Sequence, residues 1–146
     1  MKEKGTATER NTLLIIDDDV EWTDLLTVFF SQKYRVHVAN SAQDAIDAFG
    51  DVLPSVIILD LVMPSIDGFG LMQRLNAMTT SRIPTVLTTG WDNADVQACA
   101  ASVGCAAVLA KPVSLPELDR VVRSLVDGSP VQEAVGETPL FDHEPL

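Results

Sequence analysis

Five short apolar runs alternate along this chain with segments that have helical periodicity, and this alternation constrains the fold more than any other feature of the sequence. The apolar runs cover residues 13–16, 34–39, 56–59, 84–89 and 105–110. The run at 56–59 contains four consecutive aliphatic residues, which suits a strand that is buried on both faces of a parallel sheet. Because parallel strands need a crossover between them, the alternation predicts an α/β fold, a doubly wound (βα)5 parallel sheet with helices on both faces.

The helical segments are expected at residues 20–32, at 42–49, from 68 onward, at 94–103 and from 115 onward. The spacing of apolar residues predicts the buried side of two of these helices. In the first helix these residues are Trp22, Leu25, Leu26 and Phe29, and in the third they are Leu71, Met72, Leu75 and Met78. Gly50 and Gly104 are expected to end the second and fourth helices. Ser114 and Glu117 have the spacing of a capping box at the start of the fifth.

The size and charge of the chain limit its organisation and its partners. A length of 146 residues and a hydrophobic content of 47% suffice for one domain with a buried core. We expect this domain at residues 12–127, between a disordered arm at 1–11 and a disordered acidic tail at 128–146 that contains no Lys or Arg. The formal net charge of −11 argues against direct binding to nucleic acid or to an anionic membrane, since both carry negative phosphates.

Targeting signals and cysteine usage indicate the compartment. The N-terminus is charged and lacks the apolar core of a signal peptide, and no apolar run approaches the length of a membrane span. Cys99 and Cys105 do not have metal-ligand spacing, so they are expected to be small buried thiols and not a disulfide or a zinc site. These features predict a cytoplasmic protein.

Four of the five predicted strands end on groups that could carry chemistry. Asp17 and Asp18 follow the first strand, Asp60 the third, Thr89 the fourth and Lys111 the fifth. In an open parallel sheet the functional crevice lies outside the carboxyl ends of the strands, where the strand order reverses. If the first and third strands are neighbours, the three carboxylates need a cation, and all-oxygen ligands suit Mg²⁺ or Mn²⁺ better than zinc. A metal, an ammonium group and a hydroxyl around one carboxylate can stabilise a phosphoryl group on it.

Each of these residues also has a simpler interpretation. Residues 17–19 could do no more than cap the first helix, where acidic groups favour the positive end of the dipole. Lys111 could be a solvated lysine, and Thr89 an ordinary strand residue of high β-propensity. Their joint occurrence at strand ends is what the simpler interpretations leave unexplained.

In combination these residues resemble the receiver domain of two-component response regulators. That family has an acidic pair after the first strand, a phospho-accepting Asp followed by x-x-Met-Pro-x-x-Asp-Gly after the third, Ser or Thr after the fourth, and Lys-Pro after the fifth. The matching positions in this chain are Asp17 and Asp18, Asp60, Met63 and Pro64, Asp67 and Gly68, Thr89, and Lys111 and Pro112. The resemblance covers roughly residues 12–127 and implies a flavodoxin-like fold with strand order 2-1-3-4-5.

The resemblance also implies roles for the acidic residues. Asp60 would accept a phosphoryl group from a histidine kinase or a histidine phosphotransfer protein. Asp18, Asp60 and the backbone carbonyl of Val62 would bind Mg²⁺, and Asp17 would act through a metal-bound water. Such a domain is a signalling phospho-acceptor that assists its own phosphotransfer and dephosphorylation, and it is not an enzyme.

The remaining motif residues carry the response. By the same resemblance, Lys111 would contact phosphoryl oxygens, Thr89 would be the switch hydroxyl, and the bond between Lys111 and Pro112 would be cis. Val108 stands where the family often has a Tyr or Phe that turns inward, so a ring flip is not available at that position. Trp91 places a large ring near the mouth of the site, where it could slow water, shape partner access or simply cover the fourth helix.

We expect a stand-alone receiver whose output is a contact with a downstream protein. The surface for this contact is predicted on the helix at 94–103, the strand at 105–110 and the helix after Ser114. An adaptor and a phosphorelay intermediate, which would pass the phosphoryl group onward, both stay open. A flavodoxin-like FMN protein is the competing class on the same fold, but three Asp residues after the first strand would repel the FMN phosphate.

Overall fold

The computed structural model describes residues 11–128 apart from 65 and 92. The predicted arm at 1–11 and tail at 128–146 therefore lie outside the described residues, except for Asn11 and Gly128. The elements are β1 (Thr12–Ile16), α1 (Val20–Phe30), β2 (Arg35–Ala39), α2 (Ala42–Val52), β3 (Val56–Asp60), α3 (Gly68–Asn76), β4 (Thr85–Thr89), α4 (Ala94–Val103), β5 (Ala107–Ala110) and α5 (Leu115–Asp127).

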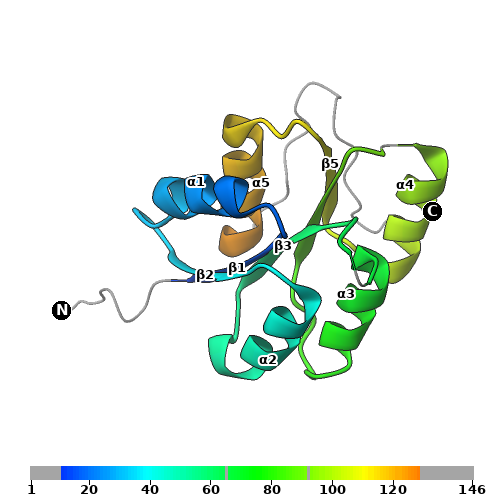
Figure 1. Cartoon of the computed structure of the whole chain (residues 1–146), viewed down its shortest axis with the longest axis horizontal. Helices are drawn as coiled ribbons and strands as arrows, with labels where there is room; N and C mark the ends of the chain where they lie inside the picture. Colours follow the sequence, from blue (N-terminus) through cyan, green and yellow to red (C-terminus); the bar gives the residue numbers. More distant parts are fainter. Residues whose placement is uncertain (1–10, 65, 92, 129–146) are drawn as a thin grey trace.

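The strands form one parallel sheet, as predicted, in the order β2-β1-β3-β4-β5 (Figure 1). The register pairs Ile16 with Leu59 between β1 and β3, and Asp60 with Thr88 between β3 and β4. The chain winds outward from β1 in one direction and then crosses back to β3, so the strand order reverses between these two strands. The flavodoxin-like fold is thereby confirmed, and the ends of β1 and β3 lie side by side.

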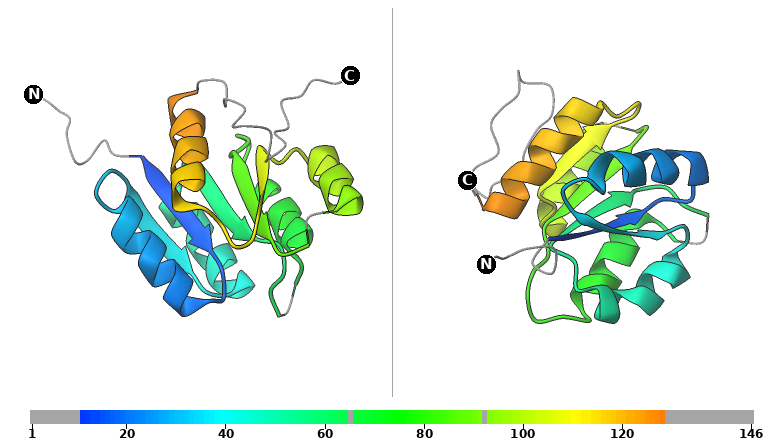
Figure 2. Two further views of the ribbon diagram at one scale, coloured as in Figure 1. Left: turned by 90° about the horizontal axis from the view of Figure 1, so that it is seen from above. Right: turned by 90° about the vertical axis from the view of Figure 1, so that its left-hand side faces the viewer.

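The helices cover the two faces of the sheet as separate layers (Figure 2). Alternate strand residues point to opposite faces, so Leu13 and Ile15 pack on the side of α1 and α5, while Leu14 and Ile16 pack on the side of α2, α3 and α4. All five residues of β3 and of β4 are buried, as expected for central strands with both faces covered. Among the helices of the described part, none has the length and apolar character needed to span a bilayer.

The buried side of α1 differs from the predicted one. Leu25 and Phe29 are exposed at 47% and 36%, and Trp22 is half-buried. The sequence contains adjacent apolar pairs at 25–26 and 29–30, so periodicity alone did not determine which member of each pair faces the sheet. The residues of α1 that are buried are Thr23, Leu26 and Phe30. The Thr23 hydroxyl donates a hydrogen bond to the Val20 carbonyl. Because the hydroxyl has this partner, the Thr23 side chain can be buried without an unpaired polar group.

Two further predictions about helices were wrong. Gly50 does not end α2, which continues to Val52 and is capped by Leu53 in a left-handed conformation with φ 50°. Pro54 follows directly and disfavours helical conformation at the residue before it. Met78 is 47% exposed because α3 ends at Asn76, before the residue could face the core.

The two cysteines are free thiols that differ in burial. Cys105 is buried, its Sγ atom lies 3.4 Å from the Met72 Sδ atom, and burial raises its pKa to about 12. Cys99 is only half-buried, so the prediction of a buried thiol holds for Cys105 alone. The prediction that Gly104 ends α4 is confirmed, since this residue caps the helix with φ 84°.

Candidate functional site

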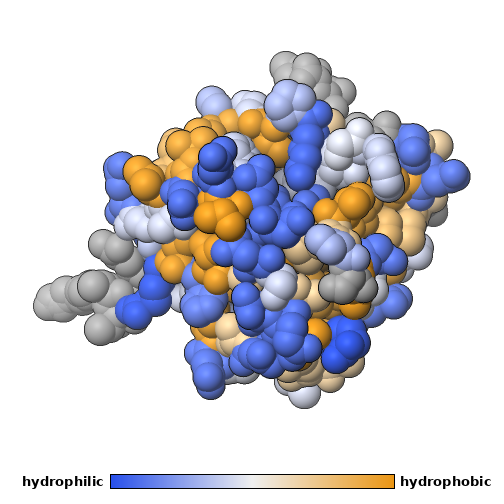
Figure 3. All heavy atoms as spheres, in the orientation of Figure 1, coloured by the Kyte–Doolittle hydropathy of each residue, from blue (hydrophilic) through white to orange (hydrophobic). Residues whose placement is uncertain are grey.

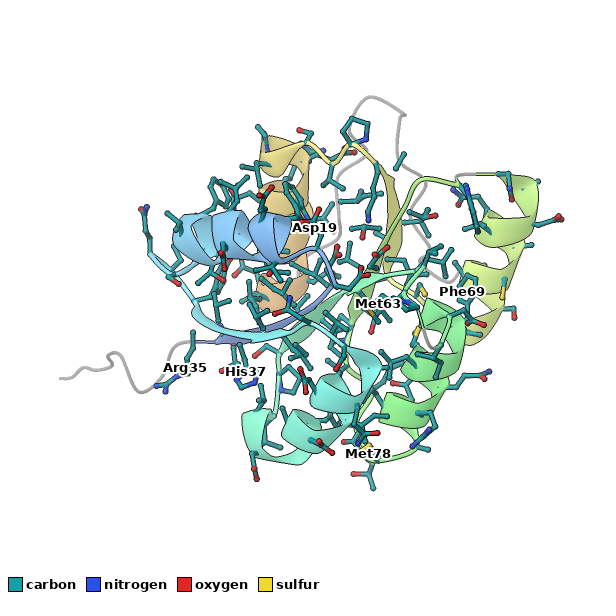
Figure 4. All side chains as sticks on the ribbon, viewed as in Figure 1. Asp19, Arg35, His37, Met63, Phe69 and Met78 are labelled. Atoms are coloured by element: carbon teal, nitrogen blue, oxygen red, sulfur yellow. The ribbon has the colours of Figure 1, made fainter. Side chains whose placement is uncertain are left out.

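The residues predicted to form a site lie at the carboxyl edge of the sheet, where β1, β3, β4 and β5 end. Asp19, at the start of α1, and Met63, in the loop between β3 and α3, lie on the two sides of this edge in Figure 4. A hydrophilic band crosses the middle of this face, between hydrophobic areas over α1 and beside α4 (Figure 3). The edge therefore presents polar chemistry between two apolar flanks.

Three carboxylates converge at the crossing between β1 and β3. One oxygen each from Asp17, Asp18 and Asp60 lie within 4.8 Å of one another. Asp17 and Asp60 are 3% and 4% exposed, whereas Asp18 is exposed. Two of the three carboxylates are thus buried and the third lies at the surface, so the cluster is open to solvent on the side of Asp18.

Backbone and side-chain hydrogen bonds fix Asp17 in this position. Its N–H donates to the Ala39 carbonyl at 3.1 Å, and its Oδ1 accepts from the Asp19 N–H at 3.0 Å. Asn40 donates from Nδ2 to the Asp17 carbonyl at 2.8 Å and to the Thr23 hydroxyl at 3.1 Å. Asn40 was not among the predicted site residues, although its place directly after a strand at the same edge was a signal that could have identified it.

Asp19 has a different task from its two neighbours. Asp19 is the N-cap of α1, and its side chain accepts a hydrogen bond from the backbone N–H of Trp22 at 3.1 Å. The simpler interpretation of the acidic run, helix capping, is therefore correct for Asp19. The carboxylates of Asp17 and Asp18 are left to face Asp60.

The pKa of Asp17 reflects its position in the cluster. The pKa is raised from 3.8 to about 6, chiefly by burial and also by the neighbouring charges of Asp60 and Asp18, while the Asp19 backbone N–H and the Lys111 ammonium group oppose the rise. The ionised form of Asp17 is therefore costly unless positive charge lies close by. The site favours a cation.

Lys111 supplies one positive charge from the end of β5. Its Nζ lies 3.1 Å from Asp60 Oδ1 and 3.8 Å from Asp17 Oδ2. The Lys111 N–H donates to the Thr89 carbonyl at 2.8 Å, so the end of β4 positions the lysine backbone. The bond between Lys111 and Pro112 is cis, as the family resemblance implied.

Thr89 ends β4, and Val62 follows the end of β3 by two residues, so both lie at the carboxyl edge of the sheet. Thr89 is fully buried, and its hydroxyl accepts a hydrogen bond from the backbone N–H of Trp91 at 2.9 Å. The Val62 N–H donates to Asp60 Oδ1 at 3.3 Å, and Val62 forms an isolated antiparallel bridge with Asp67. The amide of Val62 thus helps to orient Asp60, while the role expected for its carbonyl oxygen stays a prediction.

Gly68 allows the loop after β3 to pack closely against the site. Its N–H donates to the Leu61 carbonyl at 2.6 Å, and a Cβ atom at this position would lie 2.7 Å from the Leu61 Cα and 3.0 Å from the Asp60 carbonyl oxygen. Both are backbone atoms, which cannot move aside as a flexible side chain could. The motif glycine is therefore required by packing directly beneath the acidic cluster.

A Gly68→Ala substitution is expected to lower the free energy of unfolding by about 1–3 kcal/mol, because the added methyl group overpacks the loop against β3. Gly50→Ala is the matched control, since Gly50 lies within α2 and a methyl group added there would have no atom within 4 Å. Alanine should there stabilise the helix by roughly 0.5–1 kcal/mol. Urea unfolding of both variants measures the difference, and equal effects would contradict the packing role of Gly68.

Two hollows flank the acidic cluster. On the α1 side, Asp19, Trp22, Lys111, Pro112 and Val113 line a pocket of about 180 Å³. On the other side, a groove of about 470 Å³ is lined by residues 61–64, 66 and 67 of the β3–α3 loop together with Phe69 and Trp91. Trp91 is 63% exposed and stands beside the groove.

The donor set fits a small divalent cation. Mg²⁺ takes oxygen ligands at about 2.0–2.1 Å and keeps several waters, so a few carboxylates with one side open to solvent can hold it. The three clustered carboxylates meet that requirement, and a bound cation would favour the ionised form of Asp17, which burial disfavours. The described residues of the cluster offer no thiolate or imidazole ligand that would favour zinc.

The sequence matches the response regulator receiver domain over residues 13–123, and the chain belongs to this family. Regulatory protein AtoC of Escherichia coli is 32% identical over 116 residues, which are 77% of this chain and 24% of AtoC. Response regulator Rre1 of Synechocystis is 30% identical over 79% of this chain and 51% of that protein. The chain thus spans about a quarter to a half of the length of these curated relatives.

Solved structures agree with the family assignment. The signal receiver domain of a DNA binding response regulator protein from Colwellia psychrerythraea is 30% identical, has a TM-score of 0.74 and matches 80% of this chain and 98% of its own. A CheY-like receiver domain protein from Methanospirillum hungatei has a TM-score of 0.76 over 82% of this chain and 95% of its own; at 19% identity it supports the fold alone. Receiver domains are signalling proteins that interact with histidine kinases and downstream effectors. Because the Colwellia protein is described as DNA binding, the expectation that this chain does not contact nucleic acid stays a prediction.

Proposed function

We propose that the domain at residues 12–127 accepts a phosphoryl group on Asp60 from a phosphohistidine donor, and that phosphorylation switches a surface that binds a downstream protein. The observation that carries this proposal is the environment of one carboxylate. Asp60 is buried at the end of β3, 3.1 Å from the Lys111 ammonium group and clustered with the carboxylates of Asp17 and Asp18. Few functions other than phosphoryl acceptance need such an arrangement.

The side chains at the site orient the acceptor for attack. In the proposed transfer, a carboxylate oxygen of Asp60 attacks the phosphorus atom of a phosphoimidazole, so that a P–O bond forms while the P–N bond breaks. The electron pair of the P–N bond goes to the ring nitrogen, which takes a proton from solvent and leaves as neutral imidazole. The Val62 N–H and the Lys111 ammonium group both contact Asp60 Oδ1, which fixes the orientation of the carboxylate. Lys111 would also neutralise charge on the transferred group.

Asp17, Asp18, Asp60 and the Val62 carbonyl oxygen would hold a Mg²⁺ ion. The bound ion would supply the positive charge that phosphoryl transfer between anionic groups requires. Asp17, whose pKa is raised by burial, must lose its proton before it can contribute to this site. The same four groups could hold Mn²⁺, which also prefers oxygen ligands.

The output follows from the charge that phosphorylation adds. A phosphoryl group brings about 1.5–2 negative charges and three acceptor oxygens, and the Thr89 hydroxyl is the group that responds to them. We place the downstream contact on α4, β5 and α5, where β5 ends at Lys111 and α4 follows the turn after Thr89. In a phosphorelay, the same acceptor would pass its phosphoryl group to a histidine phosphotransfer protein.

Incubation of the protein with Mg²⁺ and acetyl phosphate is expected to attach one phosphoryl group to Asp60, because acetate is a good leaving group and the site supplies the charges. Intact mass spectrometry measures the adduct, which should survive acid and be removed by hydroxylamine, as an acyl phosphate is. Asp60→Asn should prevent labelling, while Asp51→Asn, an exposed position on α2, should label like the unmodified chain. If the Asp60→Asn variant labels equally well, the acceptor lies elsewhere and the proposal fails.

A further inference from the structure

We propose that Trp91 transmits the state of Asp60 to the surface of the domain. In the unphosphorylated protein the Thr89 hydroxyl holds the backbone of Trp91 so that its ring stays beside the groove, and in the phosphorylated protein the ring closes into the groove. This inference rests on the proposed phosphorylation of Asp60. It assigns a specific side chain and a specific surface to the response that phosphorylation would cause.

The groove gives the ring a place to go. Its volume is about 470 Å³, and apart from Asp67 its lining from the β3–α3 loop is apolar. Val62 on the rim is 45% exposed and Trp91 is 63% exposed, so unfilled apolar surface lies beside an indole that is mostly in water. Closing the ring over the groove would remove apolar surface of both partners from water, which is favourable.

One hydrogen bond restrains Trp91 next to the acceptor site. The backbone N–H of Trp91 donates to the Thr89 hydroxyl at 2.9 Å, and because Thr89 is fully buried, the acceptor side of this bond is shielded from competing water. A threonine side chain occupies one of three staggered rotamers, and only a rotamer that directs Oγ1 toward residue 91 can accept this bond. The conformation of the turn after β4 is thereby linked to the rotamer of Thr89.

Phosphorylation of Asp60 would break that link. Asp60 and Thr89 are the last residues of the neighbouring strands β3 and β4, so a phosphoryl group on Asp60 would extend past the edge of the sheet at which Thr89 lies. A phosphoryl oxygen is a strong charged acceptor, and a hydroxyl that turns to donate to it leaves the rotamer that serves Trp91. The turn at residues 90 and 91 is then released, and the apolar groove favours the closed position of the ring.

Val108 cannot provide this response. It is 1% exposed, packs in the core on the side of α2, α3 and α4, and has no ring that could change between buried and exposed positions. Trp91 by contrast has a direct contact to Thr89 and lies two residues before Asn93, the N-cap of α4. A movement of Trp91 therefore changes the groove and reaches the first turn of α4, which belongs to the proposed output surface.

Tryptophan fluorescence can test this mechanism, because the chain contains only Trp22 and Trp91. In a Trp22→Phe variant of the full chain, Trp91 is the sole reporter, and labelling with acetyl phosphate and Mg²⁺ is followed by mass in the same samples. We expect phosphorylation to shift the Trp91 emission to shorter wavelength and to reduce its quenching by acrylamide roughly twofold, since an exposed indole becomes buried. Thr89→Ala in the Trp22→Phe background should remove this response per labelled molecule, and Thr89→Ser, which keeps the hydroxyl, should retain it.

The possible outcomes separate this inference from the proposed function. If Asp60 is labelled while Trp91 emission and quenching stay unchanged, Trp91 does not carry the signal and the phospho-acceptor function still stands. A response of equal size in the Thr89→Ala variant would also overturn the inference, because the hydroxyl would then not be the restraint. If no label forms on Asp60, the proposed function fails and the inference fails with it. A Phe69→Ala variant adds an independent check, since removing part of the groove should weaken the shift in emission without reducing the label.

Discussion

Replacing Lys111 with methionine is expected to slow phosphorylation of Asp60 by about 10²-fold or more, the usual cost of losing one positioned charge at a transferring group. Its Nζ lies 3.1 Å from Asp60 Oδ1, and no other Lys or Arg of the described residues forms an ion pair with the acidic cluster. Methionine has a similar length but carries no charge, so the substitution removes the ammonium group with little change in packing. The initial rate of labelling by acetyl phosphate, followed by mass, measures the loss.

The same substitution should strengthen Mg²⁺ binding while it weakens phosphorylation. Lys111 contacts the oxygens of Asp60 and Asp17 that a bound divalent ion would share, and the repulsion between the two cations would disappear in the variant. We expect a decrease in the dissociation constant for Mg²⁺ on the order of tenfold, because two like charges about 4 Å apart repel by about 1 kcal/mol even when bulk water screens them. Titration calorimetry measures this constant.

Lys33→Met is the matched control for both measurements. The Lys33 side chain is 57% exposed and lies 3.8 Å from Asp119, away from the acidic cluster. An exposed pair of this kind contributes little, so the control should label and bind Mg²⁺ like the unmodified chain. Normal labelling of Lys111→Met, or weaker Mg²⁺ binding by that variant, would show that the ammonium group does not have the role we assign to it.

The fold was predictable because its strongest signals are local. Each central strand is a buried apolar run with a polar residue at its carboxyl end, and Asp60 at the end of β3 is the clearest case. The side of α1 that faces the sheet was not predictable in the same way. Apolar residues are adjacent at 25–26 and at 29–30, so the helical periodicity is met whether the first or the second residue of each pair is buried. The burial of Thr23 depends on hydrogen bonds to Val20 and Asn40, which only the folded chain provides.

The site could be predicted as a set of residues but not as a set of contacts. Parallel strands end at one edge, so Asp17, Asp60 and Lys111 were expected to meet there. Residue chemistry alone could not separate Asp19, which caps α1, from the two carboxylates before it, and only the family resemblance assigned Asp17 and Asp18 to the site. The bond from the Trp91 N–H to the Thr89 hydroxyl depends on turn geometry, which leaves no trace in residue spacing.

Asp17 should make the metal-free protein less stable as the pH rises from about 4 to about 6. Its pKa is about 6 in the folded protein and 3.8 in the unfolded chain, so between these values the folded state binds more protons, and the free energy of unfolding falls with increasing pH. A shift of this size corresponds to about 3 kcal/mol, which is a large part of the stability of a domain of this length. Asp17→Asn removes the ionisation, so the variant should be more stable than the unmodified chain above pH 6 and should lose this component of the pH dependence.

Mg²⁺ should reverse the effect of pH in the unmodified chain. The ion would bind the ionised carboxylate, and the free energy of unfolding would rise with the logarithm of the Mg²⁺ concentration above the dissociation constant. This increase should be large at pH 7.5 and small at pH 5, because at pH 5 Asp17 must first lose a proton. Urea unfolding at both pH values, with Mg²⁺ and with EDTA, measures this difference. Asp24→Asn, an exposed position on α1, should behave like the unmodified chain. An Asp17→Asn variant that gains as much stability from Mg²⁺ at pH 7.5 as the unmodified chain would exclude Asp17 from the metal site. The buried carboxylate would then have to be explained by its hydrogen bond from the Asp19 N–H and its ion pair with Lys111.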